Sequence, residues 1–499
     1  MSPRPKYGFT RYKRPLWAEY INNVSFWHAA QRIRRKYKMK MVFNVKDKPK
    51  FGQLIVFAIQ QLLAIMAATL VVPVIINGNA GLEGVNAMST AAALFGAGAG
   101  TLVYVLFTKG KCPVFLGSSF AFIGSMTAAF AGAVSVAVGY LGLIIGAVFA
   151  GLVYVIIAMI VKMVGVGWID RLMPAVVIGP TVAIIGLSLA SSAIGDLQKS
   201  NAGVGSPLIA VLCGIIALIV TMLCSTYGKK TAKLIPFIIG ILAGYAVAGI
   251  FTAIGYAADI DMLKISNFSS LTALVSDGVT VNTFFTLPSF TFLTAFGGFG
   301  ELSASYIGTI AVAYIPVAFV VFAEHIADHK NISSIIEQDL LKDPGLSRTL
   351  LGDGVGSMVG AAFGGCPNTT YGESVACVAI TRNASVATIV AAAVGAILIS
   401  FLSPFVAFVN SIPSCVMGGV CMALYGFIAV SGLKMIQKVD LNENSNLFVV
   451  SAILVAGIGG LSLTFGKITI TAVASSLILG IIVNLILSKK KPSEDQIGE

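Results

Sequence analysis

The chain has 499 residues, of which 57% are hydrophobic and only 11% are charged, and its formal net charge is +12. A soluble globular domain carries about 25% charged residues, and an ionised side chain costs about 2.5–3.5 kcal/mol at the centre of a membrane helix. This composition excludes an ordinary soluble protein and predicts a multi-pass membrane protein.

The first fifty residues hold all of the net positive charge. Fourteen Lys or Arg and two acidic residues lie in 1–50, and the remainder of the chain is neutral. Cations ahead of the first apolar run are typical of a cytoplasmic tail beside anionic lipid, which we favour over nucleic-acid binding. The mixed apolar and basic residues 15–40 also allow an interfacial amphipathic helix. We expect no cleavable signal peptide, because this region lacks a continuous apolar segment.

Fourteen apolar runs follow the tail, and we interpret each as one membrane crossing. Eleven are about twenty residues long, which is the length needed to span the hydrocarbon core. The long runs are 54–76, 86–108, 138–163, 172–192, 207–224, 235–256, 306–328, 384–404, 411–431, 446–464 and 468–488, and the short ones are 115–130, 350–365 and 367–381.

The loop cations support an even number of crossings. With the tail in the cytoplasm, fourteen crossings place most loop Lys and Arg residues, including those of 489–491, on the cytoplasmic side. The polar segment 257–305, which contains four acidic residues and only Lys264, then lies outside. We therefore predict a plasma-membrane protein with both termini in the cytoplasm.

Fourteen crossings divide into two halves of seven. A repeat with an odd number of crossings inserts upside down relative to its partner, which is the inverted-repeat plan of many secondary transporters. The third and tenth crossings occupy matching positions and contain short polar segments, 116–120 (LGSSF) and 367–373 (PNTTYGE). Interrupted segments at matching positions predict a substrate site near the middle of the membrane.

Three acidic residues lie within predicted crossings. Glu324 and Asp328 are four residues apart and therefore share one helix face, and Glu373 ends the polar segment of the tenth crossing. Ionisable residues in such positions usually face a cavity and mark a substrate or proton path. The alternative is a carboxylate satisfied by neighbouring donors, and it has most weight for Asp328, nearer the cytoplasmic end.

Carboxylates inside a membrane suit a substrate that presents N–H groups. A carboxylate accepts hydrogen bonds, and both uracil and xanthine carry ring N–H groups beside carbonyl oxygens. Burial disfavours the charged form of a carboxyl group, so such a group could load a proton on one side and release it on the other. We predict proton-coupled import of a nucleobase, with Glu324 and Asp328 as proton-coupling residues and no cofactor besides the proton.

Two histidines and seven cysteines can be interpreted as structural residues rather than as parts of a site. His325 and His329 lie on an adjacent stripe of the helix that carries Glu324, where they are either a proton relay or a polar helix end that enters water. The cysteines contain no CxxC pair and lie mostly in apolar runs, which indicates small buried side chains rather than disulfides or a metal site.

Two other function classes have less support. An anion transporter needs positive charge or helix N-termini facing its ligand, and the carboxylates argue against it. An intramembrane enzyme could be suggested by Gly352-Asp353 or by Ser118, but no HExxH motif, Tyr-Asp pair or nearby histidine accompanies them. We predict that the protein is not an enzyme and that Asp353 lies beside the positive end of a helix that begins there.

Three dense segments resemble the nucleobase–ascorbate transporter family, also called nucleobase cation symporter family 2, and its bacterial uracil permeases most closely. The likeness extends over about 51–488 and is strongest in 110–122 (GKCPVFLGSSFAF), 323–352 (AEHIADHKNISSIIEQDLLKDPGLSRTLLG) and 365–382 (GCPNTTYGESVACVAITR). The resemblance implies an all-α membrane fold of fourteen segments in two inverted repeats, with short paired strands in segments 3 and 10. It also implies a homodimer and elevator-like alternating access.

The same resemblance implies a division into a core domain and a gate domain. The core would comprise 51–165 (segments 1–4) and 306–405 (segments 8–11), the gate 166–256 (segments 5–7) and 406–488 (segments 12–14), with 257–305 as an extracytoplasmic connection and 1–50 and 489–499 as cytoplasmic tails.

Site residues are carried over from the family position by position. Glu324 and Glu373 match the carboxylates that hydrogen-bond the base, and Phe120 matches an aromatic side chain beside it. Further pocket positions are matched by Tyr371, Gly372 and Ala68.

Departures from the family pattern surround the expected pocket. Asp328 stands where the best-known uracil symporters have a proton-linked histidine, while Gln61 and Ser374 replace a common histidine and asparagine. The base therefore stays open between uracil, the first choice, and xanthine or another purine.

Overall fold

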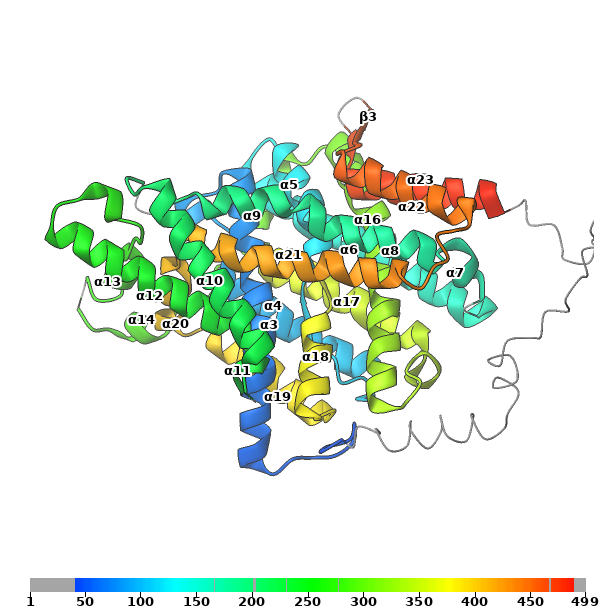
Figure 1. Cartoon of the computed structure of the whole chain (residues 1–499), viewed down its shortest axis with the longest axis horizontal. Helices are drawn as coiled ribbons and strands as arrows, with labels where there is room; N and C mark the ends of the chain where they lie inside the picture. The colour runs from blue at the N-terminus through cyan, green and yellow to red at the C-terminus, as the bar shows by residue number, and fades with distance from the viewer. Residues whose placement is uncertain are drawn as a thin grey trace, which may run out of the picture. The chain divides into compact units, whose positions relative to one another are not determined.

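Helices make up most of the described chain (Figure 1). The computed structural model describes residues 41–165, 167–200, 203–229, 231–276, 278–465 and 468–488. The amphipathic helix expected in 15–40 and the tail 489–499 lie outside these ranges. Residues from Phe43 onward form one compact unit.

The helices of the first half begin and end close to the predicted apolar runs. They are α3 (Phe51–Ala80), α4 (Thr90–Phe107), α5 (Ile123–Ala131), α6 (Val136–Val164), α7 (Gly167–Leu172), α8 (Ala175–Ser188), α9 (Ala190–Leu197), α10 (Pro207–Tyr227), α11 (Thr231–Leu234) and α12 (Pro236–Ala257). Local chemistry fixes several ends: the hydroxyl of Ser89 accepts a hydrogen bond from the backbone N–H of Ala92 at the start of α4, and Pro207 and Pro236 open α10 and α12, where a missing N–H costs nothing.

The second half follows the same pattern after a connection of short helices. That connection holds α13 (Ser269–Thr272), α14 (Val281–Phe284) and α15 (Thr291–Ala295). The remaining helices are α16 (Ala304–Ile336), α17 (Leu346–Gly364), α18 (Gly372–Thr381), α19 (Val386–Ile399), α20 (Ser403–Ser411), α21 (Ser414–Ile436), α22 (Asn444–Ile458) and α23 (Ala472–Ser488).

Eight helical segments of the described chain are long and apolar enough to cross a membrane, and five further apolar helices are shorter. This agrees with the predicted multi-pass membrane protein. The helix α17, which covers the run 350–365, is in neither group. The count of fourteen crossings and the inverted repeat therefore stay predictions.

Two short strands, one from the third apolar run and one from the tenth, pair with each other. Strand β1 (Leu116–Ser118) pairs antiparallel with β2 (Asn368–Thr370), with Gly117 opposite Thr369. A Cβ at Gly117 would lie 2.4 Å from the ring of Tyr371, so only glycine admits this ring, whose hydroxyl donates to the Ser118 carbonyl at 2.7 Å. The predicted strands in segments 3 and 10 are thereby confirmed.

A second strand pair was not predicted. Strands β3 (Leu463–Phe465) and β4 (Ile468–Ile470) pair antiparallel between α22 and α23. They lie at the adjoining ends of two apolar runs that we interpreted as helical throughout. Short apolar runs rich in β-branched residues are ambiguous between helix and strand, and this boundary is such a case.

The helices make their most extensive contacts within two sets. The first set is α3, α4, α5, α6, α16, α17, α18 and α19, and the second is α8, α9, α10, α12, α21, α22 and α23. In the first set, α4 and α17 meet along glycines: a Cβ at Gly96 would lie 2.5 Å from the carbonyl oxygen of Gly360, and one at Gly100 would lie 2.6 Å from that of Gly356. Small residues allow such close approach where no hydrophobic effect drives helices together.

A short strap precedes α3 and holds the loop between α18 and α19. In this strap, residues 43–47, Phe43 forms a parallel bridge with Asn383, and the backbone N–H of Val386 donates to the Val45 carbonyl at 3.1 Å. The hydroxyl of Ser385 donates to the Asp47 carbonyl at 2.6 Å. Val45 is only 5% exposed, so the strap is anchored by burial as well as by hydrogen bonds.

Candidate functional site

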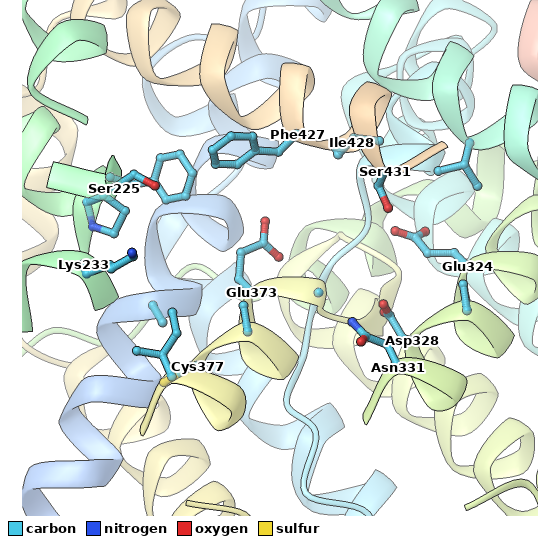
Figure 2. Close-up of a pocket in the computed structure, with 18 of the residues that line it drawn as sticks. Ser225, Lys233, Glu324, Asp328, Asn331, Glu373, Cys377, Phe427, Ile428 and Ser431 are labelled. Carbon is cyan, nitrogen blue, oxygen red and sulfur yellow. The ribbon is translucent and has the colours of Figure 1, made fainter. Parts of the chain in front are cut away.

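A cavity of about 370 Å³ is lined by helices of both sets (Figure 2). This volume lies at the small end of the range of about 300–1,000 Å³ that is typical of small-molecule sites. Its walls are largely apolar, and Phe237 and Phe427 contribute aromatic rings. Its polar side chains are Ser225, Lys233, Glu324, Asp328, Asn331, Glu373 and Ser431.

Helix α16 supplies two of the carboxylates. Glu324 and Asp328 are one helical turn apart and line the cavity, while His325 and His329, on another face of α16, are fully buried. The hydroxyl of Thr370 donates to Asp328 Oδ2 at 3.0 Å. Asp328 is therefore tied to strand β2.

Helix α18 supplies the third carboxylate. Glu373 is the second residue of this helix, which begins directly after β2 and Tyr371. The positive end of a helix favours a negative charge there. Figure 2 shows the Glu373 and Glu324 side chains projecting into the same cavity from different helices. Among the described residues, no side chain donates a hydrogen bond to either carboxylate, so both are available to accept hydrogen bonds from a ligand.

Of the seven site residues predicted from the sequence, four line the cavity and three do not. Glu324, Asp328, Gly372 and Glu373 line the cavity. The other three predicted residues, Phe120, Tyr371 and Ala68, do not belong to its lining.

The three predicted residues outside the lining are packed against, or bonded to, other parts of the protein. Phe120 is 8% exposed, and its ring lies edge-on to Tyr425 with centroids 5.8 Å apart. The Tyr371 hydroxyl donates a hydrogen bond to the Ser118 carbonyl, and Ala68 is a buried residue of α3. In this structure all three are buried and do not line the cavity.

Several lining residues were missed by the sequence analysis. Asn331 lies seven residues after Glu324 and three after Asp328, so its helical spacing could have placed it on the same face. Lys233 was counted only among the loop cations assigned to the cytoplasmic side. Ser225 directly follows the run 207–224 and Ser431 ends the run 411–431, where a lone serine gave no signal.

Two departures from the family pattern contact each other beside the site. The Gln61 side chain on α3 donates to the hydroxyl oxygen of Ser374, which also accepts from the backbone N–H of Phe115 at 2.9 Å. Gln61 and Ser374 are both buried. Ser374 follows Glu373 directly, so these bonds fix the start of α18 against α3 and against the segment that leads into β1.

The histidines of α16 form a buried polar network. His325 Nδ1 lies 2.6 Å from Asp353 Oδ2, and its Nε2 lies 3.0 Å from the Thr349 hydroxyl. The two histidine rings stack with centroids 3.9 Å apart, and His329 Nε2 lies 2.7 Å from the Tyr104 hydroxyl. Because both histidines have 0% exposure, the interpretation that they enter water at a helix end is wrong.

The expectation for Asp353 is also wrong. Helix α17 begins at Leu346, directly after Pro344 and Gly345, and Asp353 lies in its middle with no exposure. The helix start that we assigned to Gly352-Asp353 is instead marked by the preceding Pro-Gly pair. Asp353 instead faces His325 of α16 and contributes to the buried network.

Comparison with known proteins defines the family. A permease family model matches residues 52–465. The chain is 35% identical over 463 residues to the uracil permease of Bacillus caldolyticus, covering 92% of this chain and 98% of that protein. It is 34% identical over 461 residues to the uracil permease of Escherichia coli strain K12, covering 91% and 96%.

The fold has solved counterparts at much lower sequence identity. The transmembrane domain of a cyanobacterium bicarbonate transporter superimposes with a TM-score of 0.55 at 14% identity, over 89% of this chain and 100% of that chain. This likeness shows a common fold and nothing about the ligand. Since the sequence relatives are permeases, the prediction that the protein is not an enzyme is confirmed. The chain belongs to the permease family that includes the bacterial uracil permeases, as its resemblance indicated.

Proposed function

We propose that the protein imports uracil across the cell membrane together with a proton. The observation that carries this proposal is the convergence of Glu324 and Glu373, from two different helices, on one small cavity. Neither accepts a hydrogen bond from a side chain of the described residues. The uracil permeases named above support uracil as the first candidate.

The geometry suits a ligand that donates hydrogen bonds. Uracil presents two ring N–H groups, and each carboxylate can accept one or more of them. The backbone N–H groups at the start of α18, where Gly372 lines the cavity, can serve a carbonyl oxygen of the base because the first turn of a helix leaves them unpaired. The apolar walls, including Phe237 and Phe427, suit the flat faces of the ring.

We propose that transport follows elevator-like alternating access by a homodimer. The cavity lies where the first helix set, which would be the core domain, meets the second, which would be the gate domain. Close contacts within each set favour movement of one set against the other. Glu324 and Asp328 would exchange the coupled proton, because both face the cavity from one turn of α16. Both termini would lie in the cytoplasm.

A purine such as xanthine is the second candidate. Asp328 lines the cavity at a position where the best-known uracil symporters have histidine, and a third carboxylate adds an acceptor that a larger base with more N–H groups could use. An anion transporter has less support, because three carboxylates face the cavity and would repel an anion that presents no N–H groups to them.

Uptake of labelled bases by membrane vesicles tests the proposal. We expect uptake of labelled uracil to be driven by an inward proton gradient and to stop when an uncoupler removes that gradient. Uptake that continues unchanged with the uncoupler would refute proton coupling. Absence of uptake for uracil, thymine, xanthine and hypoxanthine alike would refute the nucleobase assignment.

A further inference from the structure

A lysine faces the cavity from the wall opposite α16. Lys233, on the short helix α11, belongs to the lining together with Ser225 of α10. Figure 2 shows Lys233 and Ser225 reaching in from one side and Glu324 and Asp328 from the other, with Glu373 between them. Helix α11, which carries Lys233, contacts α10 and α12 of the second helix set and α3 of the first, whereas α16 and α18, which carry the carboxylates, belong to the first set.

Neither Lys233 nor the two glutamates are neutralised by a neighbour. The ion pairs formed by the described residues include none of Lys233, Glu324 and Glu373. The cavity therefore has an anionic pole that accepts hydrogen bonds and a cationic pole that donates them. A ligand that fills it meets both poles at once.

We infer that Lys233 determines specificity by admitting pyrimidines that carry a carboxylate on the ring edge remote from their N–H groups. The inference rests on the proposed function and names a further substrate class for the same site. In uracil, the N–H groups flank the C2 carbonyl, and C5 lies directly across the ring. When the N–H edge meets Glu324, a carboxylate on C5 points past Glu373 toward the opposite wall, where Lys233 and Ser225 can donate to it.

Electrostatics explain why the lysine is required for such a ligand. Glu324, Asp328 and Glu373 would repel an anionic base from a cavity with largely apolar walls, where charges are weakly screened. The ammonium of Lys233 offsets this repulsion and forms a charge-assisted hydrogen bond with the carboxylate. A neutral base needs no such compensation, so Lys233 acts on the ratio of affinities for charged and neutral ligands.

A cytoplasmic lysine could instead serve only to orient the chain in the membrane, and Lys229 provides the comparison. It lies four residues before Lys233 and is also exposed, but it does not line the cavity. If positive charge in this loop is all that matters, Lys229 and Lys233 are equivalent. If the inference is correct, only Lys233 affects the ligand.

The experiment measures displacement of labelled uracil from the purified full-length protein by uracil-5-carboxylate and by the neutral uracil-5-carboxamide. We expect the carboxylate to displace uracil from the unmodified protein. Lys233→Gln should weaken the carboxylate relative to the carboxamide by about tenfold, the loss expected for one hydrogen bond between charged groups. Lys233→Arg should largely restore the ratio, and Lys229→Gln should leave it unchanged.

Each outcome separates the inference from the proposed function. If labelled uracil binds but the carboxylate never displaces it, the inference is overturned and the proposed function stands. If Lys233→Gln weakens carboxylate and carboxamide equally, or if Lys229→Gln has the same effect as Lys233→Gln, Lys233 does not recognise the charge. If labelled uracil does not bind the unmodified protein, the proposed function is the part that fails. Binding of the carboxamide to each variant shows that its site is intact.

Discussion

At the scale of single residues, Glu373 offers the most direct test of the site. Its carboxylate projects into the cavity from the first turn of α18. Glu373→Gln keeps the size of the side chain but replaces one acceptor oxygen with a donor and removes the charge. Because hydrogen bonds to charged groups contribute about 1.5–3 kcal/mol, we expect uracil affinity to fall by roughly 10- to 100-fold. Calorimetric titration of the purified protein measures this change.

The matched control for Glu373 is Glu83→Gln. Glu83 is exposed in a loop before α4 and lies outside the cavity lining, so its neutralisation should leave uracil affinity unchanged. Equal affinities for the Glu373→Gln variant and the unmodified protein would remove Glu373 from the site.

Substitution of Ser374, which directly follows Glu373, should lower the stability of the protein. Its hydroxyl oxygen accepts hydrogen bonds from Gln61 and from the Phe115 backbone. Ser374→Ala would leave both buried donors unpaired, at a cost of about 1–3 kcal/mol for each. We expect a clearly lower melting temperature in detergent, whereas Ser276→Ala in the exposed connection should have little effect. Identical melting temperatures for the two variants would mean that this crossing of α3, β1 and α18 is not a stabilising contact.

At the scale of elements, the strap 43–47 holds the residues that directly follow α18, the helix that carries Glu373 in its first turn. Val45→Asp would place an unpaired carboxylate at a position that is 5% exposed, and burying an unpaired charge is strongly unfavourable. We expect release of the strap, a lower melting temperature, and weaker uracil binding because α18 loses its anchor beside Asn383.

The control for the strap is Val42→Asp. Val42 is 57% exposed, so the same new charge should be tolerated there. Should both variants melt at the same temperature as the unmodified protein, the contacts of the strap with residues 382–386 would be dispensable.

Elements were predictable where run length and spacing decide the structure. The apolar runs located the long helices, whereas the strand pair around Gly117 and Asn368 was expected only from the family resemblance. The β3–β4 pair was missed because apolar runs can form either helix or strand. The start of α17 was misplaced because an acidic residue in a buried helix resembles a helix-start signal until its partner, here His325, is known.

At the scale of the whole molecule, the convergence of Glu324 and Glu373 was expected because both are ionisable residues within predicted crossings, and the family resemblance assigned both to the same ligand. The sequence could not show which polar side chains are buried in protein and which face a cavity. Whether His325 faces water or protein depends on α17, which is distant in the chain. Whether Lys233 enters a cavity or stays in a loop depends on how α11 meets α16 and α18. Such facts arise from tertiary contacts, which no local pattern encodes.

The glycine contacts between α4 and α17 have a mechanical consequence. Helices whose backbones are in direct contact cannot shift against each other without a clash, so Gly96 and Gly360 should stay in contact throughout a transport cycle. Helices α3 and α12, which belong to different sets and also touch, should change neighbours. A disulfide engineered between α4 and α17 should therefore permit repeated turnover, while one of equal length between α3 and α12 should arrest the carrier until it is reduced.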